Sequence, residues 1–258
     1  MKQMIKSITT LGITTLGTLC ALSMSWQAFA APLEISAAKE LIWDQTKGVY
    51  EAHGDAKASR GAQAISADLL TAFYDANSDD QDVTRIVATT DVSFKDGDLN
   101  GSGARLDYNV AADFYKLDGP NARILSKDGT ARAQKTLSFD RAAGIIIADQ
   151  KGEITLADGR LLQGDSITIT LTKTEEIKTV TATGNVYVRQ QDGKEAYSEK
   201  GTYNAQTGKA LLTGAVKIID GESILNGQKA EIDFNKGISR LLADERSGRV
   251  SGTLTSSE

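Results

Sequence analysis

A short alternating segment recurs along this 258-residue chain at intervals of about 30 residues. Each copy begins with a small or polar residue and continues apolar, polar, apolar, as in Asn185-Val186-Tyr187-Val188. The first apolar residues of five copies fall at positions 92, 122, 154, 186 and 216, which gives spacings of 30, 32, 32 and 30 residues. A fixed period of this length is typical of proteins built from stacked copies of one supersecondary unit. The period therefore limits the possible folds more than any single residue does.

A second alternating segment lies between most of these copies and ends with an aromatic residue followed by Asn or Asp, as in Tyr108-Asn109 and Phe234-Asn235. Alternation with a period of two residues indicates strands, and no long apolar stripe with a helical period is present. Helix candidates are limited to short pieces such as 36–41. Because a single hairpin is marginal in water, the units must stack to bury a shared apolar face. The sequence thus predicts an all-β fold of stacked, V-shaped antiparallel rungs, in the form of an elongated folded sheet or flattened jellyroll.

The alternation also predicts which side chains face the interior of this folded sheet. Successive side chains of a strand point to opposite faces, so apolar residues of one parity share a face. That interior is either a packed core or a groove that holds an apolar ligand, and both have the same parity. The candidate groove-lining residues are Val92, Phe94, Leu106, Tyr108, Leu137, Phe139, Ile154, Leu156, Val186, Val188, Val216, Ile218, Ile232 and Phe234.

The first thirty residues predict a secretory signal peptide. Lys2 and Lys6 supply a basic start, 8–22 is mostly apolar, and Ala28-Phe29-Ala30 supplies small residues for cleavage. The apolar stretch is shorter than the roughly 20 residues that a transmembrane helix requires. We therefore expect a signal peptide at 1–30 and a single exported β domain at 31–258, with an uncleaved anchor as the alternative.

The composition of the exported part disfavours several classes of function. Cys20 is the only cysteine and lies in the predicted signal peptide, so 31–258 has no thiol for a disulfide, a metal site or a nucleophile. Removing Lys2 and Lys6 leaves 29 − 2 = 27 basic residues against 34 acidic ones, a formal charge of 27 − 34 = −7. This acidic balance makes nucleic acid an unsuitable partner and favours a soluble protein between membranes.

The sequence predicts no catalytic residue, no metal site and no cofactor. His53 is the only histidine, and no serine lies in a G-x-S-x-G elbow. The acidic segment 77–82 lacks the spacing and the distal Glu of a calcium-binding loop. An enzymatic alternative, a parallel β-helix that acts on a polysaccharide, would need paired carboxylates from adjacent rungs. Asp107 and Asp140 instead lie next to turns, where Asp is common for conformational reasons.

Several segments, taken in order, are distinctive: Ile42-Trp43-Asp44, 50–56, 67–74, 226–233 and Gly248-Arg249-Val250. Together they resemble the LptA/OstA family. The resemblance covers essentially all of 31–258, and the order of the segments together with the export signal makes it specific.

Members of this family are periplasmic proteins of lipopolysaccharide transport in Gram-negative bacteria. The resemblance implies a twisted open β-jellyroll whose hydrophobic groove shelters the acyl chains of lipid A while the sugars stay outside. It also implies a head-to-tail homo-oligomer that connects an inner-membrane lipopolysaccharide-export complex to an outer-membrane barrel translocon. The fourteen residues named above become the expected groove lining, and the protein is expected to be a carrier rather than an enzyme.

Two other interpretations stay open at this point. The protein could be a free-standing adaptor of the same pathway, or its membrane-anchored component if 1–30 is not cleaved. It could also be a structural filament with a dry core and no lipid. In a head-to-tail filament of copies, the unpaired backbone groups of the first and last strands would provide the contact between neighbouring molecules.

Overall fold

The computed structural model describes residues 32–77, 81–243 and 249–253. Contacts divide the chain into Met1–Ala31 and Pro32–Glu258, and every described strand belongs to the second unit. The predicted signal peptide at 1–30 therefore lies outside the described residues. Within those residues the protein is all-β, as predicted, and no helix is long and apolar enough to cross a membrane.

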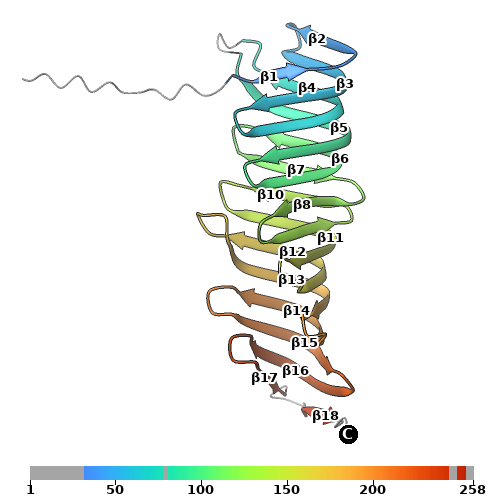
Figure 1. The fold of residues 1–258 in the computed structure, drawn as a ribbon, viewed down its shortest axis with the longest axis vertical. Coiled ribbons are helices and arrows are strands. Elements are labelled where there is room, and N and C mark those ends of the chain that lie inside the picture. The colour runs from blue at the N-terminus through green and yellow to red at the C-terminus, as the bar shows by residue number, and fades with distance from the viewer. Residues whose placement is uncertain (1–31, 78–80, 244–248, 254–258) are drawn as a thin grey trace, which may run out of the picture. The chain divides into compact units, whose positions relative to one another are not determined.

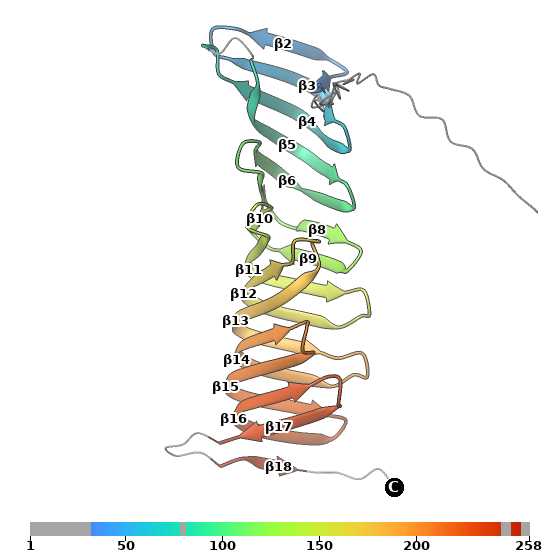
Figure 2. The ribbon, with the colours of Figure 1, turned by 90° about the vertical axis from the view of Figure 1, so that its left-hand side faces the viewer.

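The strands follow one another along the unit in nearly their sequence order (Figures 1 and 2). They are β1 (Glu34–Ser36), β2 (Glu40–Asp44), β3 (Val49–Arg60), β4 (Gln63–Tyr74), β5 (Val83–Asp96), β6 (Leu99–Asn109), β7 (Phe114–Asp118), β8 (Ala122–Ser126), β9 (Gly129–Ala133), β10 (Thr136–Asp140), β11 (Ile145–Leu156), β12 (Leu161–Leu171), β13 (Ile177–Arg189), β14 (Glu195–Asn204), β15 (Lys209–Asp220), β16 (Ser223–Asp233), β17 (Ile238–Leu242) and β18 (Ser251–Thr253).

The helix expected at 36–41 is wrong. This segment contains the end of β1 and the start of β2, and β1 pairs with β3 so that Ile35 lies opposite Ala58. Ile35 also packs against the main hydrophobic cluster. Pairing and burial therefore decide the conformation here, because six residues carry too weak a local helical preference to oppose them.

Each long strand is folded once at a corner, and the corner coincides with the start of the sequence repeat. The register between neighbouring strands shifts between Thr89 and Val92 in β5 and between Thr183 and Val186 in β13. Asp91 and Asn185, which open two copies of the repeat, have φ values of 52° and 48°. Asp and Asn tolerate this left-handed region better than most residues do. Where a copy of the repeat opens with Asp or Asn, that residue therefore marks a bend, and the predicted V shape of the rungs is confirmed.

The corners divide the sheet into two arms that face each other. We call the half-strands joined by the connection between β4 and β5 and by turns 110–113, 141–144, 172–176, 205–208 and 234–237 the first arm. We call those joined by turns 61–62, 97–98, 127–128, 157–160, 190–194 and 221–222 the second arm. The two rows of turns lie at the open side of the V, away from the corners. The interior is the space between the arms.

In the middle and at both ends of the sheet, separate short strands replace the folded ones. β6 pairs with both β7 and β8, which are separated by Gly119, Pro120 and Asn121, and β11 pairs with both β9 and β10. β1 and β2 both pair with β3, and β17 and β18 both pair with β16. Each end of the sheet is thus formed by one short strand in each arm.

The interior is apolar, with the parity that the sequence predicts. Eleven of the fourteen candidate residues are buried, and Leu156, Val188 and Phe234 are half-buried. Their neighbours Ser93 and Lys217 are exposed on the outer face. The buried residues form one large cluster from β3 to β13 and a smaller one from β14 to β16.

Candidate functional site

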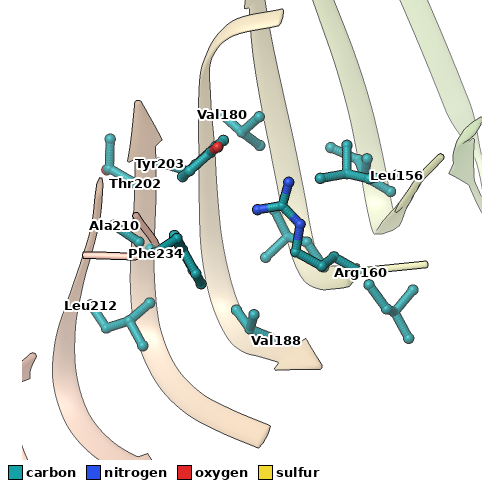
Figure 3. Close-up of a pocket in the computed structure, with 13 residues that line it drawn as sticks. Leu156, Arg160, Val180, Val188, Thr202, Tyr203, Ala210, Leu212 and Phe234 are labelled. Carbon is teal, nitrogen blue, oxygen red and sulfur yellow. The ribbon is translucent and has the colours of Figure 1, made fainter. Parts of the chain in front are cut away.

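An apolar pocket lies between the two arms in the C-terminal half of the sheet (Figure 3). Its volume is about 70 Å³. The first arm contributes residues of β13 to β15, and the second arm contributes residues of β11 to β13. The lining consists of Ile154, Leu156, Arg160, Leu161, Leu162, Val180, Val188, Gly201, Thr202, Tyr203, Ala210, Leu212 and Phe234.

This lining is suited to a hydrocarbon chain, because it removes apolar surface from water and offers few hydrogen-bonding groups. A water molecule takes a share of about 30 Å³ in the liquid, so the pocket admits only a short piece of a chain as it stands. A complete acyl chain would need the arms to move apart. The pocket is therefore the point at which the interior already begins to open.

Arg160 lies at the mouth of the pocket, in the turn 157–160 of the second arm. Its Nε and Nη2 atoms donate to Asp158 Oδ2 at 2.8 Å and 2.7 Å. Its guanidinium carbon lies 5.7 Å from the ring centre of Tyr203 and 5.6 Å from that of Phe234, both on the first arm. The hydrogen bond from Arg160 lowers the pKa of Asp158, and the same pair raises the pKa of Arg160. A charged guanidinium thus spans the mouth from one arm to the other (Figure 3).

Stacked aromatic rings fill the middle of the interior. The ring centre of Tyr115 lies 5.1 Å from that of Phe94, 4.2 Å from that of Tyr108 and 6.1 Å from that of Phe139. All four side chains are buried. Burial raises the pKa of the Tyr115 hydroxyl, which keeps it protonated and able to donate a hydrogen bond at neutral pH. We call these four rings the aromatic stack.

A polar network covers the aromatic stack at the open side of the V. Tyr115 Oη donates to Asp96 Oδ2 at 2.8 Å, and Gln63 Nε2 donates to the same oxygen at 3.2 Å. Arg141 pairs with Asp96 through Nη1 and donates from Nε to Glu175 Oε1 at 2.7 Å. Since Asp96 belongs to the second arm and Arg141 to the first, the network joins the two arms. The interior is closed at this level.

A second, smaller pocket lies in the N-terminal half, among β3 to β6. Its volume is about 30 Å³, and Ile65, Ile86, Tyr108 and Arg60 are among its lining residues. The aromatic stack begins at this pocket, where Tyr108 belongs to both, and extends through Tyr115 to Phe139 on β10, in the direction of the larger pocket. Within the part of the chain that the structure describes, the buried rings therefore separate this apolar space from the larger one.

Comparison with known proteins identifies the family. The chain matches the family described as LptA/(LptD N-terminal domain) LPS transport protein over residues 34–144 and 149–238. The chain belongs to this family. The predicted resemblance to LptA/OstA proteins is thereby confirmed, and the chain is placed among proteins of lipopolysaccharide transport.

A solved structure is also similar to this chain. It is described as LptH, the LptA homologous periplasmic component of the lipopolysaccharide transport device from Pseudomonas aeruginosa. The two sequences are 11% identical, the match covers 88% of this chain and 96% of the LptH chain, and the TM-score is 0.23. No curated protein matches the chain.

The pocket of this LptA/LptD-family chain contains only some of the residues predicted as groove lining. Ile154, Leu156, Val188 and Phe234 line the larger pocket, and Tyr108 lines the smaller one. The other candidates are buried in the clusters or in the aromatic stack, and their role as lipid-contacting residues stays a prediction. They are Val92, Phe94, Leu106, Leu137, Phe139, Val186, Val216, Ile218 and Ile232.

Sequence reasoning missed several pocket residues. Tyr203 belongs to the repeated segment that ends with an aromatic residue and Asn, so its inward position could have been inferred from Tyr108 and Phe234. Arg160 lies in a turn, where alternation assigns no face. Its place at the mouth follows only from the approach of the two arms.

Acidic side chains elsewhere in the described residues are relevant to a metal site and to a polysaccharide enzyme. Within 32–77, 81–243 and 249–253, no group of three or more His, Cys, Asp or Glu side chains could hold a metal ion. Asp107, one of the carboxylates weighed for a polysaccharide enzyme, bonds to Arg85 Nε at 2.7 Å, and this bond lowers its pKa. This contact with Arg85 gives Asp107 a structural role on the outer face of the sheet.

Proposed function

We propose that this protein is a periplasmic carrier that binds lipopolysaccharide through the acyl chains of lipid A and passes it from the inner toward the outer membrane. The observation that carries the proposal is the apolar pocket lined from both arms of the folded sheet. Membership in a lipopolysaccharide-transport family supports the same ligand. The predicted export signal and the acidic composition of 31–258 suit a protein that works between two membranes.

The energetics of the ligand explain why a carrier needs such an interior. Moving one methylene from water to apolar surroundings is favourable by about 0.8 kcal/mol, so a chain of a dozen carbons would cost on the order of 10 kcal/mol if exposed. A carrier must cover the chain along its whole path. The interior meets this need because each added rung extends the apolar inner faces of both arms.

We further propose that lipid entry separates the arms around the larger pocket. Its lining residues Val188 and Phe234 are only half-buried, whereas Leu106 and Leu137 in the middle are fully buried. Opening therefore costs least near the pocket. The remaining candidate residues, from Val92 to Ile232, would contact lipid once the opening extends along the sheet.

We also propose that copies join head to tail through the end strands. Among the described strands, β2 pairs with β3 alone and β17 with β16 alone, which leaves each with one unpaired edge. Leu41 and Trp43 lie opposite the inward residues Ala52 and Tyr50, yet their exposed fractions are 53% and 50%. An adjoining molecule would cover them and continue the apolar interior. At its two ends, such a row of copies would bind an inner-membrane export complex and an outer-membrane barrel translocon.

One observation favours a second candidate, a structural filament or adaptor with a dry core. The middle of the interior is filled by the aromatic stack and by Leu106 and Leu137, neither of which has exposed surface. A protein that never opens there could connect partners without carrying lipid through itself.

Site-specific photo-crosslinking in cells separates these candidates. A photoreactive amino acid at Val188, inside the pocket, is expected to form an adduct with lipopolysaccharide, and the same group at the adjacent Tyr187, on the outer face, is expected to form none. The two positions are adjacent in β13, but their side chains point to opposite faces of the sheet. Equal labelling at both positions, or no adduct at either, would contradict the carrier function.

A further inference from the structure

The larger pocket has one charged residue in its lining, and this residue lies at the mouth. Among the thirteen residues that line the pocket, Arg160 is the one that carries a charge. Its guanidinium extends from the second arm toward Tyr203 and Phe234 on the first arm (Figure 3). A ligand whose apolar chain fills the pocket therefore leaves its polar end beside this cation.

The guanidinium of Arg160 is held in place by contacts that engage only part of its N–H donors. The Asp158 carboxylate accepts from Nε and Nη2. A guanidinium has five N–H donors, so two bonds to one carboxylate leave donors for another oxyanion. The rings of Tyr203 and Phe234 limit the conformations of the side chain, which reduces the entropy lost when a ligand binds.

We infer that Arg160 recognises the anionic headgroup of a lipid whose chain enters the pocket. This inference rests on the carrier function proposed above and names the residue that selects the charge of the ligand. The recognised chemistry is a phosphate or carboxylate oxygen close to the start of an acyl chain. Arginine suits this task because its planar donors match the oxygens of both groups, and the adjacent apolar lining strengthens the attraction by excluding water.

Asp158 is the natural competitor of such a ligand. It lies two residues before Arg160 in the same turn, and 42% of its side-chain surface is exposed. A ligand oxyanion must share the guanidinium with this carboxylate or displace it. Removing the charge of Asp158 should therefore strengthen anion binding, whereas removing the charge of Arg160 should weaken it.

A purely structural role for Arg160 would give a different result. The side chain could close the mouth simply by packing its stem and guanidinium over the two rings. Its loss would then affect every ligand of the pocket, charged or not. The dependence of the effect on ligand charge is thus the readout that separates recognition from packing.

The test expresses the full chain, purifies the exported protein and measures its affinity for two ligands. One is lipid A with its phosphates, and the other is dephosphorylated lipid A. R160Q should weaken binding of phosphorylated lipid A by roughly ten- to a hundredfold, the range for a hydrogen bond to a charged group. It should leave the dephosphorylated form nearly unchanged. D158N should strengthen binding of the phosphorylated form, and R160K should keep part of it. Arg189, exposed at the end of β13 and absent from the lining, supplies the matched control R189Q.

The outcomes are distinct. Equal weakening of both ligands by R160Q would overturn the inference and leave the carrier function intact. An effect of R160Q that appears only with lipopolysaccharide bearing acidic core sugars would support recognition of a carboxylate rather than a phosphate. Failure of the folded wild-type protein to bind either ligand would overturn the carrier function and this inference with it.

Discussion

Arg141, in the turn after β10, forms an ion pair with Asp96 at the end of β5 and thereby ties the first arm to the second across the open side of the V. Only 8% of the Asp96 side-chain surface is exposed, and three side chains donate hydrogen bonds to Oδ2 of its carboxylate. The pair closes the interior at the level of the aromatic stack. Opening of the interior along its whole length requires this contact to break.

Removal of the Asp96 charge should destabilise the closed protein. D96N removes the ion pair between Arg141 and Asp96 while the pair between Arg141 and Glu175 stays, and loss of one member of a buried pair costs several kcal/mol. Because 26% of the Arg141 side chain is exposed to water, we expect the lower end, roughly 2–3 kcal/mol of unfolding free energy. Urea denaturation measures the effect. The control is D98N, at an exposed position in the turn 97–98 that follows Asp96. Equal losses of stability in the two variants would contradict this role of the pair.

Tyr115 should make the protein less stable at alkaline pH. Burial raises the pKa of its hydroxyl above the ordinary value of 10.0. The folded state therefore keeps the proton at a pH where the unfolded chain has released it. This contribution is fully present below pH 10.0 and is lost as the pH rises above that value. The difference in unfolding free energy between wild type and Y115F should shrink above that pH. A difference that stays constant across this range would refute the assignment.

The corners of the V should be sensitive to any side chain at their glycines. Gly184 has φ +71°, and an added Cβ would collide with the Asp165 carboxylate, which accepts a hydrogen bond from Asn185 at 2.9 Å. G184A is expected to cost roughly 2 kcal/mol, from backbone strain together with loss of that bond. Gly193 has φ +87° with open space around it, so G193A reports the backbone term alone. Thermal unfolding of the two variants should show the larger loss for G184A; the reverse order would mean that the corner is not sterically constrained.

The exposed apolar end of the sheet should govern self-association. Leu41 on β2 and Leu125 on β8 have similar exposed fractions, 53% and 47%, but only β2 is an end strand. L41D should shift the sedimentation profile toward monomer because it places a charge in the proposed contact, and L125D should not. An unchanged profile for L41D would rule out the β2 end as the contact between copies.

The repeat and its parity could be predicted because they depend on local alternation. Val92 and Val186 hold the same position in two copies of the repeat, so a whole number of rungs separates them. Both residues are buried as expected. The corner at Asn185 also left a signal, since this copy of the repeat opens with a small polar residue, but its φ of 48° and the register shift beside it are evident only from the structure. Sequence therefore predicted the rung and not the place where it bends.

The division of the interior into pockets could not be predicted. Leu137 and Leu156 have the same inward parity, yet one is fully buried and the other lines the larger pocket. The difference depends on how closely the arms approach, which contacts such as the pair of Asp96 and Arg141, 45 residues apart, help to set. Alternation within one strand holds no information about such distant contacts.

The most direct test of the account is equilibrium binding of a fluorescent lipid A analogue to the purified, folded protein. We expect saturable binding that unlabelled lipopolysaccharide displaces. V188D should weaken it by placing a charge in the pocket, and S93D, on the exposed outer face, should not. Circular dichroism would confirm that both variants stay folded. Absence of saturable binding by the folded wild-type protein would contradict the carrier function and favour the dry-core filament or adaptor.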